Sequence, residues 1–371
     1  MRKLATIRKI KDIRPIPDAD AIELAQIDGW QVVIGKKENF KVDDLVIYCE
    51  IDSILPELEP FEFLRNKKFR IKTMKLRGAL SQGIVFPLSI LNSVLPEGHS
   101  YNEFDNVHRI FVRDGSLYHI EEGLDLTELI GVEKYEPPIP AQLSGEVKGN
   151  FPHQVQKSDE ERCQNLVEDL NKLDKAMKFV ITEKLDGTSC TFALIDNEFH
   201  VCSRNLDLKE TEGNTYWKIA REQNIEEKME KYLYALGPYR IKNFAIQGEL
   251  IGEGIQKNKY KLKGQDFYIF NIFDIDNQQY FDDYKFNDFI DFTDLKAVPK
   301  VDEVSMEDFS DGDLIDNLLK YAEGKSKLNP DTEREGVVFK SKENQNIFGL
   351  SKFKKISFKA ISNKFLLKNE D

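Results

Sequence analysis

The chain has 371 residues, enough for two or three domains that each bury a core of their own. It is 40% hydrophobic and 32% charged. No run of apolar residues approaches the roughly 18 that a membrane-spanning helix needs. The N-terminal segment is charged throughout, which argues against a secretory signal. The four cysteines and five histidines form neither C-x-x-C pairs nor clusters, so disulfide frameworks and zinc sites are not expected. We therefore expect a cytoplasmic protein without a membrane partner.

The charges are unevenly distributed along the chain. A formal net charge of −12 argues against indiscriminate binding of polyanions. Basic side chains nevertheless gather in residues 62–77, which hold seven, and in residues 352–368, which hold six lysines and no acid. Each segment is either a solvated face or a local phosphate-binding surface. The second alternative would confine nucleic acid to particular parts of an acidic protein.

The N-terminal part of the chain predicts a small β-structure. Short β-rich runs broken by Pro, Gly and Asp occupy residues 4–13, 22–27, 30–35, 44–51 and 77–88. This spacing favours a small barrel or sandwich. A five-stranded OB barrel is one candidate, and such barrels commonly bind nucleic acid. We predict an OB-like domain over residues 1–105.

Residues 106–157 predict a connector. They show no clear periodicity at first, and after residue 135 they become rich in Pro, Gly and polar side chains. Ser158 follows, with Glu161 three residues later, as in a capping box. We therefore expect a helix that begins at Ser158 and continues through Leu170.

The rest of the chain, residues 158–371, predicts a second domain with antiparallel sheets. Strand-like runs at 177–185, 188–195 and 198–205 form a meander, and residues 215–236 have a helical pattern. Further strand-like runs occupy residues 243–252, 266–275, 336–341 and 356–362. The predicted class is α+β.

The stretch EKLDGTS at 183–189 has the residue types of a phosphate-handling site. In an extended backbone Lys184 and Asp186 face the same way, so they would share one pocket wall. Gly187 would let a ligand approach the backbone, while Thr188 and Ser189 add hydroxyl donors. The alternative is an ordinary Asp-Gly hairpin turn. A nucleophilic lysine must also lose its proton, which costs about 4.6 kcal/mol when its pKa moves from about 10.4 to 7. Burial, neighbouring cations or a divalent metal ion could supply that.

Six segments in order resemble the motifs of the covalent nucleotidyltransferase superfamily, which comprises ATP-dependent ligases and mRNA capping enzymes. They are KLDG at 184–187, SRN at 203–205, IQGELIGEG at 246–254, FYIFNIFDI at 267–275, EREGVVFK at 333–340 and ISFKAIS at 356–362. The resemblance implies that Lys184 becomes covalently linked to AMP. It also implies that Arg204 contacts the ribose or the acceptor end. Phe270 would stack on adenine, with Phe273 as the alternative.

The resemblance implies a larger site around these residues. The catalytic residues would be Lys184, Asp186, Glu249, Glu335 and Lys359. The nucleotide would be bound by Glu183, Gly187, Ser189, Arg204, Phe270, Lys340, Lys354 and Arg162. Asp186, Glu249 and Glu335 would hold Mg²⁺ or Mn²⁺, in part through water. The last motif has two registers, because Lys352-Phe353-Lys354 has the usual K-x-K spacing whereas Lys359 lies in SFK.

The first hundred residues resemble the N-terminal OB domain of one RNA ligase family, which places this domain before the nucleotidyltransferase (adenylation) domain. This implies an ATP-dependent enzyme that joins RNA 3′-OH and 5′-phosphate ends, at nicks in duplexes, through lysyl-AMP and RNA-adenylate intermediates. The alternatives are an ATP-dependent DNA ligase, a GTP-dependent capping enzyme and an OB-type RNA-binding protein without activity.

Overall fold

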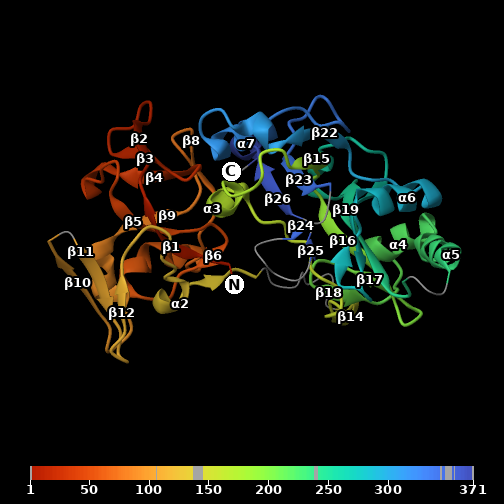
Figure 1. Cartoon of the computed structure of the whole chain (residues 1–371), viewed down its shortest axis with the longest axis horizontal. Coiled ribbons are helices and arrows are strands. Elements are labelled where there is room, and N and C mark those ends of the chain that lie inside the picture. The colour runs from red at the N-terminus through yellow and green to blue at the C-terminus, as the bar shows by residue number, and fades with distance from the viewer. Residues whose placement is uncertain are drawn as a thin grey trace. The chain divides into compact units, whose positions relative to one another are not determined.

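The computed structural model describes residues 2–105, 107–136, 145–237, 241–342 and 356–369, and the backbone alone of 345–346 and 353–354. The chain forms two compact units (Figure 1). The first comprises Met1–Pro138 with Leu366–Asp371, and the second comprises Ile139–Phe365. Both combine antiparallel sheets with helices, which confirms the α+β prediction. Within the described ranges, no helix has the length and apolar character needed to cross a bilayer.

The first unit contains the β-structure predicted near the N-terminus. Two of its three-stranded sheets have the orders β1-β5-β9 and β2-β3-β4. Their bounds are β1 Ala5–Lys9, β2 Asp12–Pro15, β3 Ile22–Ile27, β4 Trp30–Gly35, β5 Leu45–Cys49 and β9 Ile84–Pro87. In β4 the side chains of Trp30, Val32 and Ile34 alternate into the core, as a half-buried strand requires. The core is completed by Tyr48 and by Phe61 of the 3₁₀ segment Glu59–Lys67.

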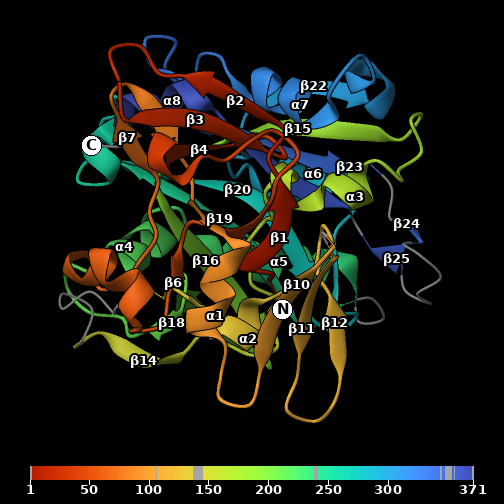
Figure 2. The same cartoon turned by 90° about the vertical axis from the view of Figure 1, so that its left-hand side faces the viewer.

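Residues 107–136 also belong to the first unit, although the sequence predicted a connector from residue 106 onwards. A meander of β10 (Ser100–Phe104), β11 (Val107–Phe111) and β12 (Leu117–His119) precedes helix α2 (Thr127–Ile130). In both views of the unit, this meander lies at the end opposite β2, β3 and β4 (Figures 1 and 2). The Thr127 hydroxyl accepts the backbone N–H groups of two N-terminal residues, which ties α2 to the start of the chain.

The second unit is built on two antiparallel sheets. The larger has the order β14-β18-β17-β16-β19-β20-β21, and the smaller has the order β22-β15-β23-β26. The strands of the larger sheet are β14 Val147–Asn150, β16 Thr188–Ile195, β17 Glu198–Cys202, β18 Leu206–Leu208, β19 Phe244–Gly252, β20 Gln265–Asp274 and β21 Gln279–Tyr280. Those of the smaller sheet are β15 Lys178–Lys184, β22 Lys300–Ser305, β23 Gly336–Ser341 and β26 Ser357–Ile361.

Each sheet of the second unit has one face covered by helices. Helices α4 (Thr215–Glu222), α5 (Ile225–Leu236) and α6 (Asp283–Thr293) pack on the seven-stranded sheet (Figure 1). Helix α7 (Leu314–Ala322) packs on the four-stranded sheet through Ile315, Leu318 and Leu319. The opposite face of the seven-stranded sheet carries a second, smaller apolar cluster that includes Ala193, Ala245 and Phe273.

Two helix predictions need correction. The helix predicted for 215–236 is broken at Asn224, whose φ of 51° lies in the left-handed region and separates α4 from α5. The helix predicted from Ser158 begins only with the 3₁₀ turn Cys163–Leu166, followed by α3 (Val167–Leu170). Arg162, not Ser158, is at its N-cap, and it makes no capping bond through its side chain. The chain keeps Ser158 outside the helix, where it lines the cavity described next.

Candidate active site

The EKLDGTS stretch carries the chain from one sheet to the other. Lys184 is the last residue of β15 in the four-stranded sheet, and Thr188 is the first residue of β16 in the seven-stranded sheet. Neither Asp186 nor Gly187 has the positive φ of a tight hairpin turn. The hairpin alternative is therefore wrong, and Lys184 lies where the two sheets meet.

Strand alternation places several predicted lysines on one face of the four-stranded sheet. Phe179 and Ile181 of β15 point into the core with Phe339 of β23 and Phe358 of β26. The residues that alternate with them along each strand point the other way. Lys184, Lys340 and Lys359 belong to this second set, and all three line one cavity.

The cavity has a volume of about 330 Å³. Both sheets contribute to its walls, together with the segment that precedes the 3₁₀ turn Cys163–Leu166. Its lining residues are Ser158, Asp159, Glu160, Thr182, Glu183, Lys184, Leu185, Asp186, Gly187, Thr188, Ser189, Arg204, Glu249, Phe270, Val298, Val338, Lys340 and Lys359. Ten of the residues predicted for the site are therefore brought together, although they come from strands far apart in the sequence.

Lys184 is surrounded by acids. Its Nζ donates to Oε2 of Glu335 at 2.7 Å, and the charges of Glu249 and Asp186 also act on it. Burial lowers the pKa of Lys184, but the three carboxylates together outweigh burial and raise it above 10.5. The sequence argument required a lowered pKa. These side chains therefore hold the amine as an ammonium ion until further positive charge is added.

The pKa of Glu249 reflects the excess of negative charge at the site. Burial, with Glu335 and Asp186 nearby, raises the pKa of Glu249 to about 8, although Lys184 and the Gly187 N–H (3.1 Å) act against this. Three carboxylates around one lysine suit a divalent cation. Within the described ranges, no three His, Cys, Asp or Glu side chains are close enough to hold one ion together. A divalent cation at this site would therefore need water molecules to complete its coordination.

Close packing gives Gly187 a structural role in addition to the one predicted for it. A Cβ at this position would lie 2.4 Å from the Leu250 carbonyl oxygen and 2.5 Å from Cγ2 of Ile251. Both belong to the neighbouring strand β19. Glycine is thus required by close packing of the protein against itself, while Gly187 also lines the cavity.

A β-bulge separates the two candidate aromatic residues. In the β19–β20 pair, Gln247 lies opposite Asn271 and Gly248 lies opposite Ile269, so Phe270 has no partner of its own. Such an extra residue redirects the side chains around it. Phe270 consequently lines the cavity, whereas Phe273 is fully buried in the core. Nζ of Lys340 lies 5.7 Å from the Phe270 ring centroid.

Cations are arranged at other parts of the wall. Burial, Arg162 and Lys184 lower the pKa of Lys359 to about 8. Arg162 is adjacent through a backbone bridge to Lys359 but is not among the lining residues. Arg204 is exposed at the rim and pairs with Asp159 at 2.8 Å. The side chain of Lys354 lies outside the described residues. The K-x-K register of the last motif, with Lys354 in the site, therefore stays a prediction.

Glu183 and Ser189 also lie at the wall. Glu183 is 1% exposed, and its Oε2 accepts the backbone N–H of Lys327 at 2.7 Å. Burial raises the pKa of Glu183. Ser189 of β16 lies opposite Glu249 of β19. Both predicted residues are thus built into the frame around Lys184.

Sequence reasoning missed two residues that contact the nucleophile segment. Lys259 forms an ion pair with Asp186, and the Tyr260 hydroxyl accepts the Asp186 N–H at 2.6 Å. Both lie in the loop after the IQGELIGEG motif. The only signal in the sequence is a group of lysines between Gly254 and Gly264, and it fits a solvated loop equally well.

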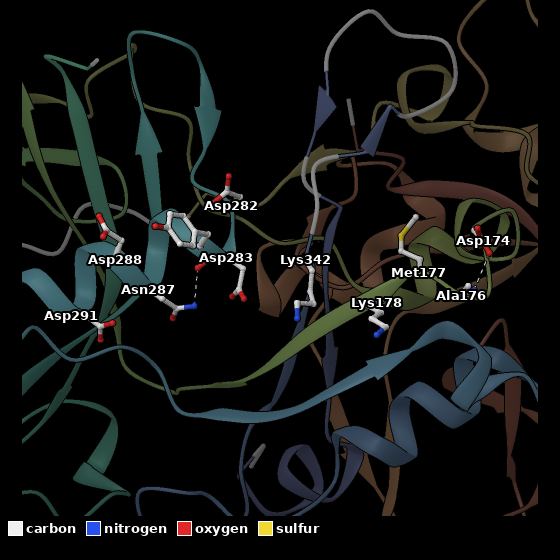
Figure 3. A pocket seen from close by; sticks show the side chains of 11 residues that line it. Asp174, Ala176, Met177, Lys178, Asp282, Asp283, Asn287, Asp288, Asp291 and Lys342 are labelled. Carbon is white, nitrogen blue, oxygen red and sulfur yellow. Dashed lines mark hydrogen bonds between the residues drawn. The ribbon is translucent and has the colours of Figure 1, made fainter. Parts of the chain in front are cut away.

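A second hollow of about 1160 Å³ lies elsewhere in this unit. Five aspartates and two lysines are among the residues that line it. Figure 3 shows the aspartates in and beside α6 on one side and Lys342 and Lys178 on the other. It is larger than the first cavity, but its acidic wall would repel a phosphate and it contains none of the predicted residues.

Comparison with known proteins agrees with this geometry. An OB-fold domain model matches residues 4–88 and an RNA ligase model matches residues 177–361. No curated protein matched the chain. Structures of Naegleria gruberi RNA ligase match over the full length. The structure with PPi is 38% identical, covers 100% of each chain and has a TM-score of 0.75. A variant with ATP and Mn is 37% identical, covers 99% of each chain and has a TM-score of 0.75. A variant with AMP and Mn is 38% identical, covers 100% of each chain and has a TM-score of 0.75. The chain therefore belongs to the RNA ligase family, with an OB-fold domain before its ligase domain.

Proposed function

We propose that this RNA ligase uses ATP and a divalent metal ion, and that Lys184 is the residue that carries AMP. The observation that supports this most is the position of Lys184 in a cavity between two sheets, 2.7 Å from Glu335. The ATP and Mn in the structures of the Naegleria enzyme support the choice of nucleotide and metal.

The first step transfers AMP to the protein. The neutral amine of Lys184 attacks the α-phosphorus of ATP, the bond to the bridging oxygen breaks and pyrophosphate leaves. Oε2 of Glu335 already accepts the Lys184 N–H, so the proton that the amine loses is directed toward this oxygen. Asp186, Glu249 and Glu335 would hold the metal ion, whose positive charge favours the neutral amine.

The other side chains bind the nucleotide. Phe270 supplies the apolar surface for the adenine ring, and Lys359 and Lys340 of the four-stranded sheet supply positive charge. Arg204 at the rim contacts the ribose or the incoming RNA end, after exchanging its partner Asp159.

The later steps join RNA. The adenylate moves from Lys184 to an RNA 5′-phosphate, and a 3′-OH then attacks this phosphate and releases AMP. We propose a nick in a duplex as the substrate, with ribonucleotides on the 3′-OH side, because the first hundred residues and the order of the two domains resemble a family with this activity. The basic segment 62–77 of the OB domain would contact the phosphates.

Labelling with α-³²P-ATP tests the first step. Wild-type protein with Mg²⁺ or Mn²⁺ should acquire an acid-stable, hydroxylamine-labile label, and Lys184→Ala should acquire none. Lys178→Ala is the matched control, since Lys178 is an exposed lysine at the other end of β15. An unlabelled wild type, or equal labelling of Lys184→Ala, contradicts the proposal. Replacing ATP by GTP separates a ligase from a capping enzyme.

Nick sealing tests the substrate. Duplexes with a single 3′-OH/5′-phosphate nick should be sealed faster with RNA than with DNA on the 3′-OH side. Equal rates would remove the proposed preference while leaving the ligase activity intact.

A further inference from the structure

The loop between β19 and β20, residues 252–264, is closed at its neck. The Glu253 N–H donates to the Gly264 carbonyl at 2.9 Å. A Cβ on Gly252 would lie 2.2 Å from the same oxygen, so the two ends touch. Both glycines have positive φ, 125° and 74°. The 252–264 loop is therefore a defined excursion from the sheet, not a slack connection.

The backbone of the loop is held in an uncommon conformation. Gln256, Lys257 and Asn258 have consecutive φ values of 43°, 59° and 45°. Left-handed non-glycine residues persist where the surroundings hold them, and they concentrate at functional sites. Here the Asn258 side chain bonds both backbone groups of Leu262, at 2.8 and 3.1 Å. Asn329 donates to the Lys259 carbonyl at 2.9 Å.

This rigid loop contacts the nucleophile segment at consecutive positions. Tyr260 accepts the Asp186 N–H at 2.6 Å, and Lys259 pairs with the Asp186 carboxylate. Nε2 of Gln256 donates to the Gly187 carbonyl at 3.4 Å. Tyr260 is 5% exposed and shares a buried cluster with Leu185.

The contacted segment has few other supports. Residues 185–187 follow the last pair of β15 and precede the first pair of β16, so they lie in neither sheet. Their conformation decides where the adjoining Lys184 points. Lys259 is itself fixed, because its Nζ lies 4.2 Å from the Phe365 ring centroid and its side chain is 17% exposed.

We propose that the 252–264 loop positions Lys184 for attack on ATP, with Lys259 and Tyr260 as positioning residues that act through Asp186. This inference rests on the proposed function and assigns the loop a part in the first step alone. A lysine nucleophile must meet the α-phosphorus in line, and small displacements of a reacting group cause large losses of rate. Neither residue lines the cavity; they hold the backbone and the carboxylate of Asp186, two residues from Lys184.

Transient labelling of the full-length protein with α-³²P-ATP tests the inference through Lys259→Ala, Lys259→Arg and Tyr260→Phe. At saturating ATP, Lys259→Ala and Tyr260→Phe should form lysyl-AMP about 10- to 100-fold more slowly. The ATP concentration for half-maximal rate should change less than about 2-fold, because the nucleotide wall is intact. Lys259→Arg should recover most of the rate by restoring the ion pair.

Lys261→Ala is the matched control. Lys261 lies in the same loop with a positive φ of 53°, and it forms an exposed ion pair with Asp331 at 2.9 Å. Its removal should leave the rate within about 2-fold of wild type. Thermal unfolding of all variants is measured alongside.

The outcomes separate this inference from the proposed function. An unlabelled wild type contradicts the proposed function itself. Labelling of the wild type with unchanged rates in Lys259→Ala and Tyr260→Phe overturns only the role of the loop. So does a loss that appears solely as weaker ATP binding, or a loss in Lys259→Ala that Lys259→Arg fails to recover. Slower AMP transfer in folded variants, with recovery by arginine, supports the inference.

Discussion

The carboxylates around Lys184 lower the stability of the folded protein while serving catalysis. Lys184 has an ion-pair partner in Glu335, yet Glu249 stays buried beside two other carboxylates. Buried like charges favour protonation of one of them. Functional sites commonly hold such groups at the expense of stability. Glu249 is therefore a residue whose removal should stabilise the protein while harming catalysis.

The stability of Glu249→Gln relative to wild type should depend on pH. The pKa of Glu249 is about 8 in the folded protein and near 4.5 when unperturbed, so its protonated form favours folding below pH 4.5. That contribution is lost as pH rises to 8, and the free energy of unfolding of the wild type falls by at most about 1.4 kcal/mol per pH unit. Glutamine does not titrate. The variant should therefore gain stability relative to wild type between pH 5 and 8, as measured by chemical denaturation.

Parallel stability curves for the two proteins over this range would contradict the prediction. Lysyl-AMP formation by Glu249→Gln, measured in parallel, should fall because the metal site loses a carboxylate.

Substitutions of Phe270 and Phe273 form a matched pair that separates an effect on ATP binding from an effect on folding. Phe270→Ala removes a half-exposed ring from the cavity wall, so we expect a 5- to 100-fold higher ATP requirement, corresponding to the roughly 1–3 kcal/mol of base stacking. Phe273→Ala removes a fully buried ring and should lower the free energy of unfolding by about 3–5 kcal/mol. ATP titration of labelling and denaturant unfolding measure the two effects. A large stability loss with unchanged ATP use in Phe270→Ala would identify that residue as core.

The sequence located some site residues better than others. Lys184, Glu249 and Lys359 could be placed because they lie within recognisable motifs on strands, and strand alternation fixes which way they point. The protonation of Lys184 could not be predicted, because it depends on the distances among acids from several strands. Lys259 and Tyr260 were missed because a loop with left-handed residues has no periodicity.

At the level of elements, irregularities in the strands shape the site. Seven strands of the second unit were predicted from alternation and β-rich composition, and those elements are confirmed, whereas β14, β18, β21 and β22 were not predicted. The bulge at Phe270 could not be predicted, because the sequence of β20 is apolar on both sides and gives no sign of an extra residue. The left-handed break at Asn224 was missed for a similar reason, since the helical pattern continues on both sides.

Close packing between β19 and the nucleophile segment predicts a specific sensitivity. Gly187→Ala introduces a Cβ only 2.4 Å from the Leu250 carbonyl, so the backbone around Asp186 must move. We expect a loss of about 1–3 kcal/mol of stability, together with slower lysyl-AMP formation. Gly149→Ala in β14 is the control, because a Cβ there has no heavy atom within 4 Å and φ is not positive. Equal stability and equal rates of lysyl-AMP formation in the two variants would show that the contact at Gly187 determines neither.

At the scale of the whole molecule, the residues of the cavity all belong to the second unit. The boundary near residue 138 lies within a segment whose Pro and Gly content marked it as a connector. The meander and α2 were not expected in the first unit, because strands with weak periodicity at 100–119 gave no signal. Arg65 and Arg70 of the basic segment pair with Glu62 and Asp52. The phosphate-binding capacity of this segment therefore depends on its four lysines and Arg77.

A fragment comprising residues 139–371 should separate the two halves of the reaction. It keeps every residue of the cavity, so it should form lysyl-AMP at a rate within about 10-fold of the full chain. Without the OB domain it should seal nicked RNA poorly, since a large part of nucleic-acid affinity comes from phosphate contacts. Labelling and sealing assays on the same preparation measure both. Undiminished sealing by the fragment would remove the OB domain from the proposed substrate contacts.

The bridge made by residues 184–188 has an implication for protein engineering. Opposite walls of the nucleotide cavity belong to separate sheets, so its width follows from how far apart those sheets are held. Side chains of the buried cluster beside the cavity that do not line it, such as Ile251 and Tyr268, act as spacers. Resizing these spacers offers a route to altered nucleotide selectivity in which no atom that touches the nucleotide is replaced.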